Sequence, residues 1–375
     1  MNTKQPQQIE NELSPLLKGE CFADIFTRVA FSTDGSIYQI IPLCIIAPAD
    51  TDDVVAVVKY AHQNNIPISP RGAGSGLGGE SLTPGIMLDM TRFMNKIIGS
   101  SADGRAIICQ PGVVLDDANK YLANFGKKIG PDPSSGNRAV IGGVVANNST
   151  GAHSLSFGYI AEYVEKIKAV LADGTVTEFV NDSDPADKIS KQCFELLNSN
   201  AELIEKSQPS TKRNHSGYNI AGIIHNNRID MAKLLAGSEG TFAVFTEITL
   251  RSVDVPKVSA VVQFEFDSLD KMARAVPLIV DCGASACELM GQDLIKIARE
   301  AFEQYHDILN PNSVASLLVE FCGDTDYEVK AKIEKTVSAV GELCFDKKIV
   351  FDPAIQKRLF KCRKDAVPLL GRKKG

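Results

Sequence analysis

The chain has 375 residues, with 40 Lys and Arg against 46 Asp and Glu and a formal net charge of -6, which excludes a nucleic-acid-binding protein with a basic face. Its hydrophobic fraction of 44% and charged fraction of 23% are those of an ordinary globular protein, and no apolar run approaches the roughly 20 residues of a membrane span. The length predicts two domains, because it exceeds the usual size of one hydrophobic core.

The cysteines and the N-terminus predict a cytoplasmic protein. A peripheral position at the inner face of the membrane is compatible with this prediction. The nine cysteines contain no C-x-x-C pair, so we expect reduced, mainly buried thiols and no zinc site. The polar, glutamine-rich start from Met1 to Glu10 does not have the pattern of a signal peptide.

The first predicted elements lead into a glycine-rich loop. Residues 1–30 predict a polar tail and a short amphipathic helix. Asp50 can cap a helix over Thr51–Gln63, whose valines supply an apolar face. Ile66-Pro67-Ile68 then predicts a short strand. The loop that follows, Pro70 to Gly79, has five glycines within eight residues. Such a loop can turn several backbone N–H groups toward one anion, so it predicts a diphosphate site.

Three kinds of nucleotide site compete for this loop. Gly74, Gly76 and Gly79 have the G-x-G-x-x-G spacing, but a Rossmann motif must open a helix, and residues 80–85 predict a turn. A Walker A loop fails because Glu80 stands where a phosphate-binding lysine is required, and a glutamate there would repel phosphate. The third kind is a loop between two short strands that holds the diphosphate of FAD by backbone alone.

Two more glycine-rich stretches follow in the same half of the chain. Strands are predicted over 86–90 and 106–109 and a helix over 115–124. A rigid turn at 131–136 then precedes a helix start at 141–148. Gly142 and Gly143 at that start either leave helix N–H groups accessible to a ligand or allow close packing on a strand. A hairpin over 164–179, a polar helical region over 182–205 and a third glycine turn leading into a strand that ends at Leu250 complete this half.

Beyond Pro256 glycine becomes sparse and strands alternate with helices. Strands are predicted over 258–266, 286–290 and 315–321, and helices over 269–282, 294–304 and 327–340. This alternation predicts a sheet with helices on one face.

Four segments in this order resemble the FAD-binding PCMH-type domain of the vanillyl-alcohol oxidase and para-cresol methylhydroxylase superfamily. They are 33–42, 71–79, 131–135 with 141–151, and 237–250. Within it the chain resembles the FAD-linked D-2-hydroxyacid dehydrogenases, which act on D-lactate, glycolate or D-2-hydroxyglutarate. The resemblance implies an α+β fold. A tail and helix at 1–37 would precede a bipartite FAD-binding domain at 38–251, followed by an α/β, ferredoxin-like substrate cap at 252–375, incomplete at its C-terminus.

The resemblance also implies FAD as the cofactor, bound non-covalently, because members with flavin linked at this loop have a histidine where Ser75 stands. The residues implied at the diphosphate are Arg71, Gly72, Ala73, Gly74, Ser75 and Gly76. At the ribityl chain and flavin edge the resemblance implies Pro131, Asp132, Ser134 and Ser135. On the flavin and its phosphates it implies Gly142, Gly143, Asn148 and Gly151. It also implies a contact of Val164 with adenine, and a pocket closed by Gly240 and Val244. Residues 147–151 depart from the family's threonine-asparagine-alanine-glycine-glycine, which leaves the contacts there open.

The candidate catalytic residues are Arg363 and His153. Arg363 aligns with an arginine that the family places near the substrate carboxylate, a role that suits a guanidinium, although a solvated charge on a basic helix is the alternative. His153 follows the second glycine cluster and is a candidate for contact with flavin or substrate. No metal is predicted, because the five histidines (His62, His153, His215, His225 and His306) include no ligand spacing such as H-x-x-x-H.

The implied reaction is oxidation of a D-2-hydroxy acid, of the D-lactate or D-2-hydroxyglutarate type, by hydride transfer to FAD while a base accepts the hydroxyl proton. The implied partners are that small acid and an electron acceptor outside this chain, a quinone or an iron–sulfur module. Two alternatives stay open: an FAD-containing, NADPH-dependent reductase of the enolpyruvyl sugar-nucleotide type, and a non-catalytic flavin-binding module. The branch's metal-binding histidine pair lies in a portion that this sequence does not contain, so the resemblance predicts an N-terminal fragment of a long member, with poor turnover.

Overall fold

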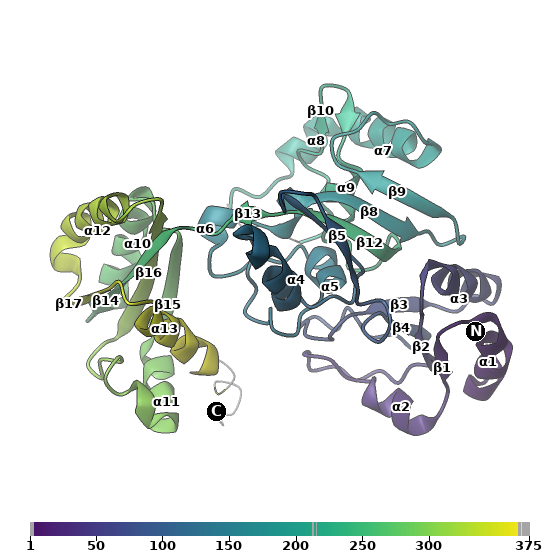
Figure 1. The fold of residues 1–375 in the computed structure, drawn as a ribbon, viewed down its shortest axis with the longest axis horizontal. Coiled ribbons are helices and arrows are strands. Elements are labelled where there is room, and N and C mark those ends of the chain that lie inside the picture. The colour runs from purple at the N-terminus through teal and green to yellow at the C-terminus, as the bar shows by residue number, and fades with distance from the viewer. Residues whose placement is uncertain (1–3, 212–213, 215, 367–368, 370–375) are drawn as a thin grey trace. The chain divides into compact units, whose positions relative to one another are not determined.

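A computed structural model describes residues 4–211, 214, 216–366 and 369. His215 lies outside the described residues. The chain divides into two compact units (Figure 1): unit 1 comprises Met1–Ser149 and Tyr159–Asp254, and unit 2 comprises Thr150–Gly158 and Val255–Gly375. A short stretch from the middle of the sequence, Thr150–Gly158, therefore packs with the C-terminal part of the chain.

Unit 1 contains a four-stranded sheet that carries the first glycine-rich loop. Its order is β1-β2-β4-β3, with β1 antiparallel to β2 and the other three strands parallel. The strands are β1 (Glu20–Phe22), β2 (Cys44–Ala47), β3 (Ile68–Arg71) and β4 (Ile86–Asp89). Because β3 ends at Arg71, the loop leaves the sheet at the carboxyl ends of its parallel strands, where open α/β sheets bind ligands.

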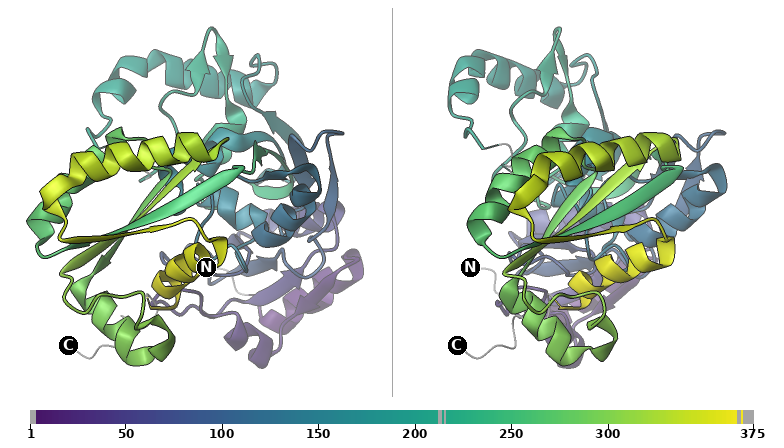
Figure 2. Two further views of the ribbon diagram at one scale, coloured as in Figure 1. Left: turned by 60° about the vertical axis from the view of Figure 1, so that its left-hand side comes forward. Right: turned by 90° about the vertical axis from the view of Figure 1, so that its left-hand side faces the viewer.

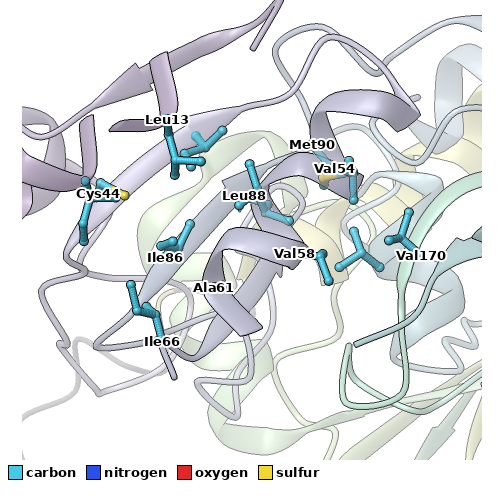
Figure 3. Packing of buried hydrophobic residues seen from close by; sticks show 14 of the residues in the cluster. Leu13, Cys44, Val54, Val58, Ala61, Ile66, Ile86, Leu88, Met90 and Val170 are labelled. Atoms are coloured by element: carbon cyan, nitrogen blue, oxygen red, sulfur yellow. The ribbon is translucent and has the colours of Figure 1, made fainter. Parts of the chain in front are cut away.

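Helix α3 (Thr51–Gln63) forms the main core of this sheet together with α1 (Pro6–Leu13). It begins as predicted, because the Asp50 carboxylate accepts the N–H groups of Asp52 and Asp53 at 3.0 and 3.1 Å. Its apolar side, which includes Val54 and Val58, packs on β4 in one buried cluster (Figure 3). Every side chain of β2 and β4 is buried.

A second sheet of unit 1 is antiparallel and has the order β5-β6-β12-β8-β9. Its strands are β5 (Ile97–Ser100), β6 (Ala106–Cys109), β8 (Val164–Val170), β9 (Val176–Val180) and β12 (Val244–Arg251). The third glycine turn precedes β12, the central strand. The remaining elements of unit 1 are α2 (Ile25–Ala30), α4 (Leu115–Leu122), α5 (Ile141–Ala146), α7 (Lys188–Ser199), α8 (Ala201–Lys206), α9 (Met231–Leu235), β7 (Lys127–Lys128), β10 (Ile224–His225), β11 (Arg228–Ile229) and β13 (Val253–Asp254).

Unit 2 has one antiparallel sheet of order β15-β16-β14-β17. The strands are β14 (Val258–Phe266), β15 (Ala286–Gly291), β16 (Ala315–Gly323) and β17 (Asp346–Val350). With α10 (Leu269–Asp281) after the first strand and α12 (Asp326–Val340) after the third, the strand order is that of a ferredoxin-like fold, as the sequence predicts.

Helices cover both faces of this sheet (Figure 2), which corrects the prediction of one covered face. Apolar residues of α10 and α12 pack on one face, including Ala260 and Val262. Residues of α11 (Gln292–Ala301) and α13 (Pro353–Ala366) pack on the other, around Val261 and Leu318. The continuous burial of β14 beyond its first two residues follows from this double cover. The short helix α6 (Ser154–Phe157) belongs to the same unit. Within the described ranges, no helix combines the length and the apolar composition needed to cross a membrane.

Candidate functional site

A cleft in unit 1 is lined by all three glycine-rich segments. The loop after β3, the first half of α5 and the turn before β12 meet there, around a volume of about 1020 Å³ that includes open solvent. The predicted site residues that line it are Arg71, Gly72, Ala73, Gly74, Ser75, Gly76, Ser135, Gly142, Gly143 and Gly240. The structure therefore brings together segments that are up to 175 positions apart in the sequence, since the lining residues run from Pro70 to Phe245.

The loop after β3 presents backbone donors to this cleft. Among the described residues, no hydrogen-bond acceptor is found for the N–H groups from Ala73 to Leu77. Gly74 has a φ of +61°, and a Cβ there would lie 2.4 Å from the Arg71 guanidinium, so only glycine fits. Successive backbone N–H groups in such a turn form an anion-binding concavity.

Arg71 supports the loop through its guanidinium. The residue is 9% exposed, and its guanidinium donates hydrogen bonds to the carbonyl oxygens of Thr33 at 2.7 Å and Phe31 at 3.3 Å. Burial lowers its pKa, against the neighbouring charges of Asp34 and Asp89. Two of its N–H groups thus fix the 31–33 segment to the loop.

The two glycines of α5 differ in what surrounds them. A Cβ on Gly142 would lie 2.7 Å from the Cβ of Pro111, and the Gly142 N–H donates to the Pro111 carbonyl at 2.8 Å. This glycine allows close packing of the helix. A Cβ on Gly143, which lines the cleft, would meet no described atom within 4 Å other than those of its chain neighbours and the backbone of its own helix. The packing explanation therefore applies to Gly142, while access of a ligand to the helix at Gly143 stays a prediction.

Two models of known families match the chain. The FAD binding domain matches residues 42–179, and the C-terminal domain of FAD linked oxidases matches residues 255–375. The chain thus carries an FAD binding domain followed by the C-terminal domain of FAD linked oxidases. These matches confirm the predicted cofactor, FAD, and the predicted two-domain α+β architecture.

The chain is 29% identical over 386 residues to a D-2-hydroxyglutarate dehydrogenase of Pantoea ananatis, covering 95% of the chain and 38% of that relative. It is 28% identical over 352 residues to the glycolate oxidase subunit GlcD of Escherichia coli, covering 92% of the chain and 61% of the subunit. A solved structure of alkyldihydroxyacetonephosphate synthase matches with a TM-score of 0.67 at 18% identity, covering 96% of the chain and 64% of that structure, which shows a shared fold. The chain spans less than two thirds of the length of each of these proteins.

The cleft in unit 1 fits FAD, the cofactor that the matched domains indicate. The backbone donors of the loop suit a diphosphate, whose charge they can neutralise without a lysine. The open space beside Gly143 leaves room for a ligand at the backbone. Val140, Val144 and Phe245 supply apolar surface to the same cleft. Residues of this unit could therefore hold FAD by main-chain hydrogen bonds and apolar contact.

Several predicted cofactor residues are not among the described lining of this cleft. Pro131, Asp132 and Ser134 share a turn with Ser135, which does line it. Asn148 is buried and has a φ of +45°. Its Oδ1 accepts the Ala161 N–H at 3.0 Å, so this side chain connects the end of α5 to residue 161. The other three are Val164, the buried first residue of β8; Val244, the first residue of β12; and Gly151, which packs with unit 2.

The two candidate catalytic residues lie together in unit 2. His153 Nε2 pairs with the Glu320 carboxylate, and the His153 and Phe360 rings are 6.3 Å apart. Phe360 is on α13, as is Arg363, whose guanidinium pairs with Glu288 at 2.5 Å. The Arg363 Nε atom is buried, with no hydrogen-bond partner among the described residues.

Both carboxylates come from neighbouring strands of unit 2. In the register of β15 and β16, Ala286 is opposite Glu320, so Glu288 projects from the same face two residues along. The result is a polar face on which one carboxylate pairs with a histidine and the other with an arginine. For the residues the structure describes, no group of three His, Cys, Asp or Glu side chains could hold a metal ion.

Sequence reasoning did not identify some residues of the cleft. Glu80, Asn147 and Glu239 line it, yet Glu80 entered only as an argument against a Walker A loop. Its position directly after Gly79 was the available signal. Pro111 and Met90 also line the cleft and carry no recognisable pattern.

Proposed function

We propose that this chain forms the FAD-binding and substrate-cap parts of an oxidoreductase that oxidises a D-2-hydroxy acid. The observation that carries the proposal is the cleft lined by the three glycine segments, with backbone donors that have no acceptor among the described residues. It is supported by relatives named for D-2-hydroxyglutarate and glycolate, which align with more than nine tenths of the chain.

Unit 1 holds FAD non-covalently in this proposal. The N–H groups from Ala73 to Gly76 bind the diphosphate, Ser135 offers a hydroxyl, and Gly143 lets the cofactor approach the helix backbone. When bound there, FAD would supply the two-electron redox chemistry that oxidation of a hydroxyl-bearing carbon requires. Because the donors are main-chain groups, their charge distribution does not change with pH.

Unit 2 supplies the residues for the substrate. Arg363 binds the carboxylate of the hydroxy acid, a geometry in which two parallel N–H···O bonds are possible. Since Glu288 already pairs with Arg363, the substrate carboxylate competes with Glu288 for the guanidinium. His153 receives the hydroxyl proton, and Glu320 stabilises the protonated imidazole. The electron acceptor is a quinone or an iron–sulfur module outside this chain.

The test is anaerobic mixing of the purified yellow protein with D-2-hydroxyglutarate, D-lactate and glycolate, while flavin absorbance is followed. We expect bleaching by at least one of these acids, with the L enantiomers of the first two as matched controls. Bleaching by NADPH and by none of the acids would replace the proposal with a reductase. A yellow protein that none of them bleaches would indicate a flavin-binding module without this activity.

A further inference from the structure

One side chain of the cleft carries the wrong charge for a diphosphate site. The Glu80 carboxylate lines the cleft, directly after the glycine-rich loop. Its Oε2 accepts the Gly78 N–H at 3.1 Å, and its Oε1 accepts the Asn147 amide at 2.7 Å. Gly78 belongs to the first glycine-rich segment and Asn147 to the second, so Glu80 links two walls of the cleft.

The carboxylate also lies directly against the loop backbone. A Cβ placed on Gly76 would be 1.6 Å from the Glu80 Oε1 atom. Gly76 stands within the run of N–H groups that have no acceptor among the described residues. An anion that binds these groups would therefore meet the Glu80 carboxylate at close range.

The other charged side chains in the lining of the cleft leave two carboxylates against one guanidinium. The charged side chains in its lining are Arg71, Glu80 and Glu239. Arg71 already donates to two carbonyl oxygens. A diphosphate adds about two negative charges, and like charges at a few ångströms in a partly desolvated cleft repel strongly. The same repulsion that excludes a Walker A site opposes any diphosphate while Glu80 keeps this position.

We propose that Glu80 acts as a latch on the cofactor cleft, held by Gly78 and Asn147, and that a diphosphate must displace it to bind the loop. Glu80 then sets both the affinity and the rate of FAD uptake. The inference rests on the proposed FAD site in unit 1. It makes Glu80 a determinant of cofactor binding that acts by opposing the ligand.

The test measures FAD binding to the full chain stripped of flavin, by quenching of FAD fluorescence and by calorimetry, over a range of salt concentrations. Glu80→Gln keeps an acceptor for Asn147 and removes the charge. We expect its Kd for FAD to fall about tenfold and its association rate to rise, with affinity less dependent on salt than in the wild type. Glu195→Gln, which removes an exposed carboxylate from α7, is the matched control and should behave as the wild type.

Two further variants separate the charge from the hydrogen bond. Glu80→Ala should reproduce the tighter binding, which guards against a folding defect particular to glutamine. Asn147→Ala should raise the association rate while the salt dependence persists. Equal or weaker FAD binding by both Glu80 variants, with unchanged circular dichroism, would overturn the latch alone. No FAD binding by the wild type or any variant would overturn the proposed cofactor site and the latch with it.

Discussion

In unit 1 the cleft presents backbone N–H groups that have no acceptor among the described residues, whereas in unit 2 the candidate catalytic face is made of paired side chains. The loop from Ala73 to Leu77 offers N–H groups. The face in unit 2 offers a histidine and an arginine, each already paired with a glutamate. A backbone site depends on glycines that keep side chains away, while a side-chain site depends on the identity of each charged group.

Because of this difference, ligand binding is opposed by different interactions in the two units. Main-chain donors hold a fixed orientation and need no proton exchange. Arg363 can bind a new carboxylate only when Glu288 gives way, because both compete for the same guanidinium. We therefore expect glycine substitutions in unit 1 to act by filling the cleft, and substitutions of the paired residues in unit 2 to act through charge.

The largest expected effect concerns the bond between flavin and protein. If unit 1 holds FAD by main chain alone, acid precipitation should release all of the yellow colour, because Ser75 cannot form the stable histidyl link to flavin. Absorbance of the supernatant and chromatography of the released cofactor measure this, with free FAD as the standard. Colour that stays in the pellet would contradict it and direct attention to His153.

The second prediction separates the two glycines of α5. Gly143→Val should weaken FAD binding about hundredfold, since the added side chain enters the cleft at a cost of about 3 kcal/mol. It should leave the fold intact, because within the described ranges no atom beyond the adjoining residues and the backbone of α5 lies within 4 Å of that Cβ. Gly142→Ala, the matched control, should instead lower the free energy of unfolding by about 1–3 kcal/mol through contact with Pro111.

The flavin-to-protein absorbance ratio and thermal unfolding followed by circular dichroism distinguish these outcomes. Full flavin occupancy in Gly143→Val would show that this glycine does not face the cofactor.

The third prediction tests the paired charges of unit 2. Arg363→Ala should raise KM for the hydroxy acid about 10–100-fold, the range expected for lost charge-assisted hydrogen bonds. Glu288→Gln should lower KM severalfold, because it removes the competing carboxylate. Steady-state kinetics of both variants beside Arg363→Lys measure this. A higher KM in Glu288→Gln would mean that the pair is structural.

The smallest effect is a pH dependence inside unit 2. Burial raises the pKa of Glu265 above its ordinary value of 4.5, against hydrogen bonds from Ser313, Gln263 and Ser316. The folded protein thus binds this proton more tightly than the unfolded chain, so its contribution to stability is full below pH 4.5 and is lost as pH rises through the raised pKa.

Urea unfolding of Glu265→Gln at several pH values should show a shallower decline over that window than the wild type. Glu334→Gln, on the exposed side of α12, is the control. An identical decline in the wild type and Glu265→Gln would assign the pH dependence to other groups.

The sequence predicts the elements whose signals are local. The bounds of α3, β6 and β14 agree with the structure, because an N-cap or a continuous apolar run marks each one. It does not predict β2, β5 or β17. The last of these, Asp346–Val350, is an edge strand with four exposed residues, so it carries no apolar alternation.

The same contrast applies to the sites. The glycine-rich loop is predictable because glycine itself is the signal. The contacts of Arg71 with residue 33, of Glu80 with Asn147 and of His153 with Glu320 span 38, 67 and 167 positions. Residue type and spacing contain no information about such pairs, which form only when the sheets are assembled.

Because Thr150–Gly158 belongs to unit 2, the two units cannot be recombined between proteins by a single crossover. The chain passes between the units three times, after Ser149, after Gly158 and after Asp254. A recombination event at Asp254 would give the new cap a foreign α6, whose Ser156 hydroxyl bonds the Ser285 carbonyl at 3.4 Å. A cap from another protein would keep its own packing only if residues 150–158 were exchanged together with residues 255–375. A single crossover at Asp254 does not exchange both segments.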